Sequence, residues 1–231
     1  MRGDSIGQRV RASLARHGAP RTFFYFALKS LNRVVWVRIL KGFHIEDPDP
    51  AYLGAPERYR CGFLDEQALA GYCGREDYEL PEAFLRSALG KGDECYGILA
   101  GGTLAGYGWY SKTATEVTDD LRLHFDPRYI YMYKGFTHPE HRGQRLHAIG
   151  MTQALAAYRE RGHRGLVTFV EADNFDSLKS VRRMGYRCFG SLFVVRILGR
   201  YLSLTTPGCG EYGFGLETAP GARPARGSAP A

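Results

Sequence analysis

One stretch of the chain combines the residue types that bind phosphate: Gly135 to His147, with the sequence GFTHPEHRGQRLH. It joins an apolar, strand-like run to a helix-like one. The first amides of a helix have no partner within it, and the helix dipole is positive there, so such a turn suits a phosphate or pyrophosphate. Gly143 lets an anion approach the backbone, and Arg142 and Arg145 add positive charge. The spacing therefore predicts an anion-binding turn.

Histidine and cysteine residues form no recognisable metal site in the sequence. His138 and His141 lie in a proline-containing loop, and no third ligand follows at a spacing typical of zinc. The cysteines are scattered, and none belongs to a C-x-x-C pair. This pattern favours reduced thiols in a cytoplasmic protein over a disulfide framework. We therefore expect no bound metal.

The elements around the turn alternate between strand and helix. Residues 129–136, dense in Tyr, Ile and Phe, are the most strand-like segment. The helix that follows ends at Gly162 and has one apolar face, formed by Ala148, Met151, Leu155 and Tyr158. The predicted order is strand, helix, strand, helix and strand, with the last three at about 166–170, 175–184 and 186–195.

Upstream, the pattern predicts a strand over 59–64, a short helix capped by Asp65 and a helix over 82–89. Two further strands follow, at 95–100 and 103–110. Gly101-Gly102 between them indicates a hairpin. A long connection then leads to residue 129.

Two segments in this order resemble the GCN5-related N-acetyltransferase (GNAT) family: HPEHRGQRLH after an apolar strand, and VEADNFDSLKSVRRMGY. The likeness covers about residues 59–196. It implies an α/β fold with a mixed, splayed central sheet flanked by helices. It also implies acetyl-CoA or another acyl-CoA as donor, bound between two parallel strands. The cofactor contacts would then come from Phe136, Thr137, Arg142, Gly143, Gln144, Arg145, Leu146, His147 and Asn174.

The chain departs from the family pattern at two points. The family's turn is usually Gln/Arg-x-x-Gly-x-Gly/Ala; Arg142 fits its first position, but Arg145 and His147 stand where small residues are expected. Many relatives also have a tyrosine, seven residues after the asparagine, that protonates the leaving thiolate. Asn174 matches the asparagine, whereas Val181 occupies the tyrosine's place. Another acid must therefore serve if the chemistry is intact.

Other side chains could move protons. Tyr133 is the first candidate acid, followed by Tyr131, which shares its face of the strand, and by Tyr186. An ammonium acceptor must lose a proton before it attacks, and Glu171 and His138 are candidate bases. The alternative is structural: the tyrosines pack beneath a helix, and Glu171 is a solvated or arginine-paired carboxylate.

The resemblance predicts an acyl-CoA-dependent N-acyltransferase that acts on an amine-bearing small molecule or amino sugar by direct attack on the thioester. Two alternatives stay open. One is a non-catalytic binding module on the same fold. The other is a transferase that takes its acyl group from a carrier protein or an aminoacyl-tRNA. The sequence lacks an RNA-binding pattern of basic and aromatic residues, so no nucleic-acid partner is expected.

Composition divides the chain into three zones. Hydrophobic residues make up 44% and the net charge is +7, values typical of a globular domain with an anionic partner. Residues 1–50 form a basic, aromatic-rich N-terminal extension, 51–216 form the GNAT-like domain, and 217–231 form a Pro/Ala/Gly-rich tail predicted to be disordered. No segment is long and apolar enough for a membrane-spanning helix.

The extension is too apolar to stay solvated, with FFYFAL at 23–28 and VVWV at 34–37. Its cations, at positions 29, 33, 38 and 41, spread around a helical projection. A helix in a membrane interface has a distinct polar side, so this spread favours packing against the acyltransferase domain or a second copy, as in a homodimer. Peripheral membrane contact through residues 22–41 is the alternative.

Overall fold

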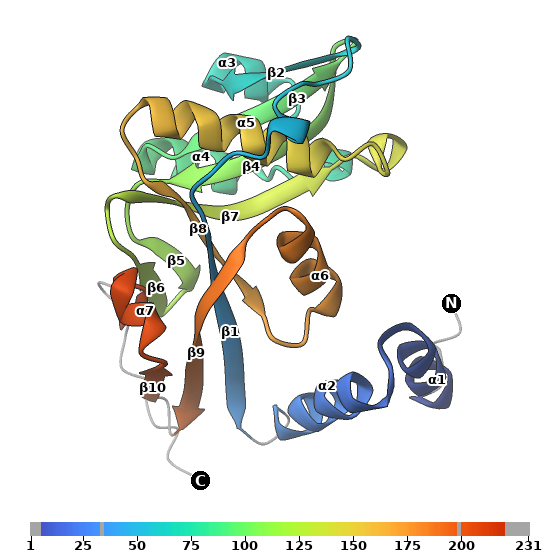
Figure 1. Cartoon of the computed structure of the whole chain (residues 1–231), viewed down its shortest axis with the longest axis vertical. Coiled ribbons are helices and arrows are strands. Elements are labelled where there is room, and N and C mark those ends of the chain that lie inside the picture. The colour runs from blue at the N-terminus through green and yellow to red at the C-terminus, as the bar shows by residue number, and fades with distance from the viewer. Residues whose placement is uncertain (1–5, 33–34, 198–199, 220–231) are drawn as a thin grey trace, which may run out of the picture.

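The computed structural model describes residues 6–32, 35–197 and 200–219, and these build an eight-stranded sheet (Figure 1). Helices flank the sheet, as the resemblance implied. Of the tail predicted to be disordered from residue 217, residues 220–231 lie outside the described residues, whereas residues 217 and 218 belong to the strand β11 (Gly215–Thr218). In spatial order the strands are β10 (Arg200–Thr205), β9 (Arg187–Ile197), β1 (Trp36–Ile45), β8 (Gly165–Glu171), β7 (Tyr129–Thr137), β4 (Thr103–Ser111), β3 (Glu94–Ala100) and β2 (Tyr59–Leu64).

The sheet is splayed between β7 and β8, the pair of neighbouring strands that run parallel. Their pairing covers only Tyr129–Tyr131 against Gly165–Val167 in the described part of the chain. Beyond these residues the two strands diverge (Figure 1). The other neighbouring strands pair antiparallel, which leaves this divergence as a gap in the middle of the sheet.

One face of the sheet is covered by α5 (Leu146–Glu160) and α6 (Phe175–Arg183). The predicted apolar face of α5 packs there, with Met151, Leu155 and Tyr158 in the largest buried cluster. Ile130 and Met132 of β7 meet them from the sheet. Because side chains alternate along a strand, the tyrosines of β7 point to the opposite face.

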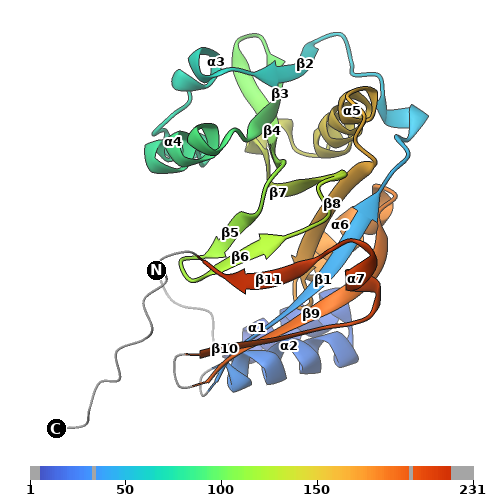
Figure 2. The same ribbon diagram turned by 90° about the vertical axis from the view of Figure 1, so that its left-hand side faces the viewer.

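That opposite face is covered by α3 (Glu66–Ala70), α4 (Glu82–Lys91) and a second sheet, in the order β11 (Gly215–Thr218), β6 (Leu121–His124) and β5 (Thr115–Thr118). Figure 2 shows this small sheet on the side away from α6. Tyr129 and Tyr131 are buried beneath it, beside Leu123 and Phe214. The short helix α7 (Gly208–Glu211) and the 3-10 turns η1 (Pro50–Tyr52), η2 (Glu76–Tyr78) and η3 (Pro139–His141) complete the described elements.

The predicted elements between residues 59 and 197 form close to their expected bounds. Asp65 caps α3 by accepting from the Ala68 amide, and Gly101 and Gly102 have the positive φ of a tight hairpin. The connection around Asp119-Asp120 is itself a hairpin of β5 and β6, which the sequence did not reveal. Strands of this length carry too few residues for a periodic signal.

The N-terminal region differs from its expected role as a separate extension ending at residue 50. Residues 36–45 are β1, which pairs with β8 on one side and β9 on the other. The central sheet therefore begins at Trp36, and a helical projection does not apply to Arg38 and Lys41. Burial between two strands stabilises an extended conformation that local pattern alone did not indicate.

Two helices precede this strand, α1 (Ile6–His17) and α2 (Ala19–Leu31). They join each other through the Ser13 and Thr22 hydroxyls, 2.9 Å apart. Their contacts with the domain include an exposed ion pair between Arg16 and Asp176, a ring contact between His17 and Phe175, and the Arg21 guanidinium 5.7 Å from the centroid of the Phe175 ring. Exposed ion pairs contribute about 0–1 kcal/mol, so these contacts hold the helices weakly.

Candidate active site

A pocket of about 190 Å³ occupies the gap between β7 and β8. On one side it is lined by β7, from Met132 to Gly135, and on the other by β8 and the inner face of α6. Val181, the residue at the family's tyrosine position, lines it together with Ser177 and Ser180. The gap thus offers an unpaired strand edge and hydroxyl groups to an extended ligand.

The predicted anion-binding turn lies at one end of this gap, where η3 leads into α5. Gly143 has φ +78 and Arg145, the N-cap residue of α5, has φ +59, so both are left-handed. A Cβ on Gly143 would meet nothing within 4 Å, so the space above this part of the turn is open. The unpaired amides at the start of α5 can therefore be reached by an anion.

Some side chains of the turn already contact other parts of the protein. Arg142 Nε donates weakly to the Thr137 carbonyl, at 3.4 Å, and Gln144 Oε1 accepts from Arg58 at 3.0 Å. Leu146 is buried in the core. His147 points to β7, where a Cβ on Gly135 would overlap its ring. Burial lowers the pKa of His147, so the ring is neutral near pH 7 and adds no charge for a phosphate.

The left-handed backbone of Arg145 leads to a testable prediction. An L-residue in this conformation costs about 1 kcal/mol, which glycine avoids. We expect Arg145→Gly to raise the free energy of unfolding by up to about 1 kcal/mol, and to weaken coenzyme A binding about five-fold at low salt through loss of the guanidinium. Thermal unfolding and calorimetry at two salt concentrations measure both effects.

Arg142→Gly is the matched control, because Arg142 has φ −65 and gains nothing from glycine. It should lower stability. If Arg145→Gly also lowers stability, the backbone of the turn is not strained. If Arg145→Gly binds coenzyme A as tightly as the parent at low salt, Arg145 does not contact the phosphates.

A model of the acetyltransferase (GNAT) family matches residues 62–186, which include β7, the turn, α5, β8 and α6. The chain belongs to the GNAT acetyltransferase family. The matched region of this GNAT chain spans the splayed strands and the turn described above.

Solved structures with a similar fold are distant in sequence. They include a tandem GNAT protein from the clavulanic acid biosynthesis pathway (20% identity, TM-score 0.47, covering 74% of this chain and 54% of that one). A GCN5-related N-acetyltransferase from Sphaerobacter thermophilus is 15% identical (TM-score 0.49, 73% and 54% covered), and a GCN5-related N-acetyltransferase-like protein from Streptococcus suis is 18% identical (TM-score 0.47, 76% and 67% covered). The present chain thus spans about half the length of the first two. No curated protein sequence matches it.

The three candidate tyrosines of this GNAT chain lie on two faces of the sheet. Tyr131 and Tyr133 share a face, with ring centroids 5.9 Å apart, and Tyr131 also stacks near Phe169. Tyr186 lies on the α6 face, lines the gap and donates its hydroxyl to Met132 Sδ at 3.6 Å. Sulfur is a weak acceptor, so this hydroxyl can turn to a better one.

Burial raises the pKa of all three tyrosines above the usual value, most strongly for Tyr133, where the Asp93 carboxylate adds to the effect. Each hydroxyl therefore stays protonated at any physiological pH. A thiol of ordinary pKa near 8.5 holds its proton less tightly than these phenols. The tyrosines are thus suited to donate a hydrogen bond to a leaving thiolate rather than to give up the proton fully.

The two predicted bases lie apart from each other. Glu171 ends β8, and its carboxylate is 3.3 Å from the Arg38 guanidinium, with 43% of the side chain exposed. His138 begins η3, beneath Tyr78, with ring centroids 5.5 Å apart. Its Nδ1 is buried and has no hydrogen-bond partner among the described residues. Neither Glu171 nor His138 lies beside Tyr133 in the structure.

A buried carboxylate that the sequence did not single out contacts Tyr133 instead. Asp93, between α4 and β3, has a side chain only 1% exposed. Its Oδ2 accepts from the Tyr133 hydroxyl at 2.8 Å and lies 3.0 Å from Lys91 Nζ. Its Oδ1 is buried without a hydrogen-bond partner in the described part of the protein. Such an atom is rare in native proteins and marks a place for a donor from a ligand or water.

Asn174 has a structural role in this fold. Its side chain accepts from the Ser177 amide at 3.1 Å and so caps α6, and it borders a cavity beside α1. We predict that Asn174→Ala lowers the free energy of unfolding by about 1 kcal/mol, because it removes the cap, while Asn174→Asp keeps it. Chemical denaturation measures this. Unchanged stability of Asn174→Ala, together with weaker coenzyme A binding, would instead assign the side chain to the cofactor.

Proposed function

We propose that the chain is an acyltransferase that moves an acyl group, acetyl in the simplest case, from coenzyme A to the amine of a small molecule or amino sugar. The observation that carries the proposal is the pocket between the diverging strands β7 and β8, which ends at the open N-terminus of α5. An extended ligand with a pyrophosphate at one end fits both parts.

On the donor side, residues of the gap would hold the arm of coenzyme A against the free edge of β7. The amides of residues 143–147 would bind the pyrophosphate, with Arg145 as a charged contact. The Tyr186 hydroxyl would then exchange its weak bond to Met132 for the departing sulfur. Ser177 and Ser180 are further hydroxyl donors on the wall of the same gap.

On the acceptor side, the pair of Tyr133 and Asp93 would receive the proton of the incoming ammonium. The Tyr133 oxygen takes a proton from the amine as its own proton passes to Asp93 Oδ2 along their 2.8 Å hydrogen bond. Tyr133 ends neutral, Asp93 ends protonated, and the amine attacks the thioester carbonyl. The nitrogen's second proton then passes to the departing thiolate of coenzyme A as the C–S bond breaks. Asp93 Oδ1, which lacks a partner in the described residues, could accept a second hydrogen bond from the ammonium.

A thiol-release assay tests the proposal. Purified protein is given acetyl-CoA with a panel of primary amines, including an alkyl diamine, an amino acid and an amino sugar, and calorimetry measures coenzyme A binding separately. Amine-dependent thiol release is the expected result. Binding without release across the panel would favour a non-catalytic module, and the absence of binding would point to another acyl donor, such as a carrier protein or an aminoacyl-tRNA.

A further inference from the structure

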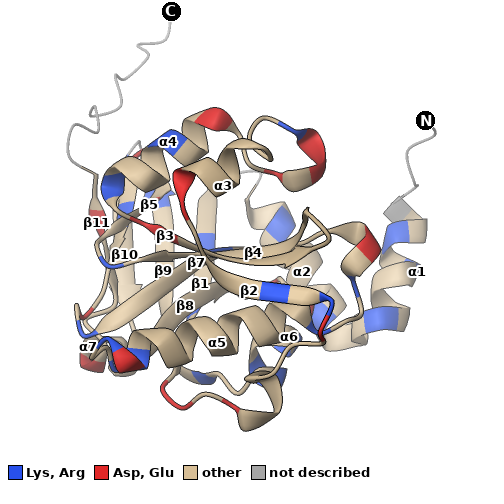
Figure 3. Ribbon diagram, turned by 90° about the horizontal axis from the view of Figure 1, so that it is seen from above, with Lys and Arg blue, Asp and Glu red and all other residues tan. Residues whose placement is uncertain are grey.

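The positive charge of the protein is concentrated at its N-terminus. Residues 1–45 contain nine Lys and Arg residues and one acidic residue, whereas the whole chain has 31 and 24. The rest of the chain is therefore close to neutral. Helices α1 and α2 have no acidic residue, and Figure 3 shows Lys and Arg segments along α1.

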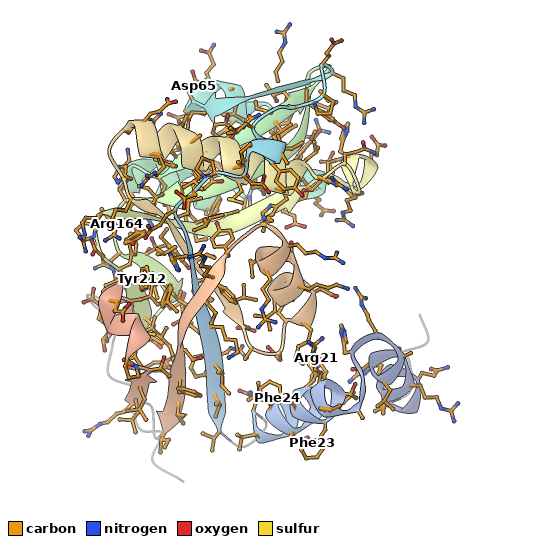
Figure 4. All side chains as sticks on the ribbon, in the orientation of Figure 1. Arg21, Phe23, Phe24, Asp65, Arg164 and Tyr212 are labelled. Carbon is orange, nitrogen blue, oxygen red and sulfur yellow. The ribbon has the colours of Figure 1, made fainter. Side chains whose placement is uncertain are left out.

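The same region exposes large apolar side chains. Phe23 is 77% and Leu31 is 48% exposed on α2. Figure 4 shows Phe23 pointing away from the rest of the molecule, at the outer side of α2. A phenylalanine in this position gains little from the fold, because most of its side chain stays in contact with solvent. A single exposed apolar side chain is ordinary on a protein surface, whereas a larger apolar patch is typical of an interaction site.

The neighbouring strands extend this apolar surface. Leu202 and Leu204 on the edge strand β10 are 60% and 74% exposed, and Phe193 of β9 is 40% exposed. Leu204 pairs with Phe193, and Phe193 pairs with Ile39 of β1, so these side chains share one face of the sheet. Figures 1 and 2 both place α2 and the ends of β9 and β10 at the same end of the molecule.

A cavity of about 500 Å³ between α2, α6 and β1 adds more cations. Lys41 of β1 is one of these cations. It lies two residues from Ile39, which pairs with Phe193, so its side chain is on the same sheet face as Phe193 and Leu204. The described lining contains no acidic side chain. Its residues are Arg21, Lys41, Ala172, Phe175, Leu178, Lys179, Arg182 and Arg183.

The positive charge and the exposed apolar side chains together restrict which kind of partner can bind this end of the molecule. A second copy of the chain would bring the same positive region against this one and be repelled. A nucleic acid would meet the cations but would leave aliphatic side chains such as Leu31 and Leu204 uncovered. An anionic bilayer satisfies both, since lipid headgroups attract Lys and Arg while Phe and Leu enter the acyl boundary.

We propose that this end of the molecule, which comprises α1, α2, the cationic cavity and the exposed face of β9 and β10, binds the surface of an anionic lipid bilayer. Phe23 and Leu31 enter the interface, and Arg21, Lys179 and Arg183 contact headgroup phosphates. The described residues include no helix long and apolar enough to cross a membrane. The proposal does not depend on the acyl-transfer reaction.

Vesicle sedimentation of the full chain tests it. Vesicles of phosphatidylcholine with about one-quarter phosphatidylglycerol should bind the protein, and pure phosphatidylcholine should not, because each surface cation contributes about five-fold in affinity. High salt should weaken binding. Phe23→Glu combined with Leu31→Glu should abolish it, and both residues are exposed, so the fold is unaffected. Lys179→Glu combined with Arg183→Glu should lower affinity by at least about 25-fold.

Arg60→Glu combined with Arg86→Glu is the matched control, because it changes the net charge equally at exposed residues of β2 and α4, far from α2. It should retain nearly all vesicle binding. The proposal is wrong if neutral vesicles bind equally, or if the control loses as much affinity as Lys179→Glu with Arg183→Glu. It is also wrong if the parent binds no anionic vesicles. Dissociation of a dimer in light scattering, or release of bound nucleic acid, by the substitutions at Phe23 and Leu31 would then identify a second copy or a nucleic acid as the occupant.

Discussion

Replacing Gly143 with valine is expected to abolish coenzyme A binding, with a loss of at least about 100-fold, or ~2.7 kcal/mol. Gly143 has φ +78, a conformation that a β-branched residue adopts only under strain. The space above it is open, so a valine side chain would occupy the approach to the α5 amides that the pyrophosphate needs. Calorimetric titration with coenzyme A measures the effect.

Gly162→Val is the matched control for this substitution. Gly162 has φ +91 and open space around it, but it follows the other end of α5. Both variants should lose similar stability from backbone strain, whereas only Gly143→Val should lose coenzyme A. If Gly143→Val binds as well as the parent, or if both variants lose binding equally, the cofactor does not lie on this turn.

Asp93→Asn is expected to lower turnover by about 10²- to 10⁴-fold while coenzyme A affinity stays within about three-fold. The amide keeps the shape of the carboxylate and can still accept from Tyr133, but it cannot accept a proton. Because the acceptor must be deprotonated before it attacks, the variant should regain activity as pH rises toward the ordinary pKa of the amine. A pH–rate profile of kcat/KM reveals this shift.

Lys91→Gln distinguishes a catalytic role of Asp93 from a structural one. It removes the 3.0 Å ion pair with Asp93 yet keeps the carboxylate and its hydrogen bond from Tyr133. Turnover of Lys91→Gln should stay within about ten-fold of the parent. Equal losses in both variants, with equal losses of stability, would mean that Asp93 only compensates a buried charge.

The sequence predicted the strand, the turn and the helix of the proposed cofactor side, because the signals for these elements are local. A strand, a glycine-containing turn and a helix start within one stretch of chain, and the turn residues are neighbours in sequence as well as in space. The family likeness rests on the same continuous segments, and the match over residues 62–186 confirms it. The splayed sheet followed from that likeness rather than from composition or period.

The pair of Asp93 and Tyr133, which we propose for the acceptor side, could not be predicted from the sequence in the same way. Asp93 and Tyr133 are forty residues apart and meet because β3, β4 and β7 are neighbours in the sheet. Nothing in the residues around Asp93 distinguishes it from other carboxylates that follow a helix. Its burial and its unpartnered oxygen set it apart from the other described carboxylates, and both depend on elements that pack around it from several parts of the chain.

What the sequence by itself determined about this protein is therefore its family and its elements from residue 59 to 197, apart from the hairpin of β5 and β6. These depend on side-chain period, capping residues and short motifs, which act over a few residues. Only the tertiary structure decided that residues 36–45 form a central strand, that Asp93 bonds Tyr133, and that α2 and β10 expose apolar side chains at one end. Each depends on pairing or burial between distant segments, and a strand edge or a buried face is defined by its neighbours in space.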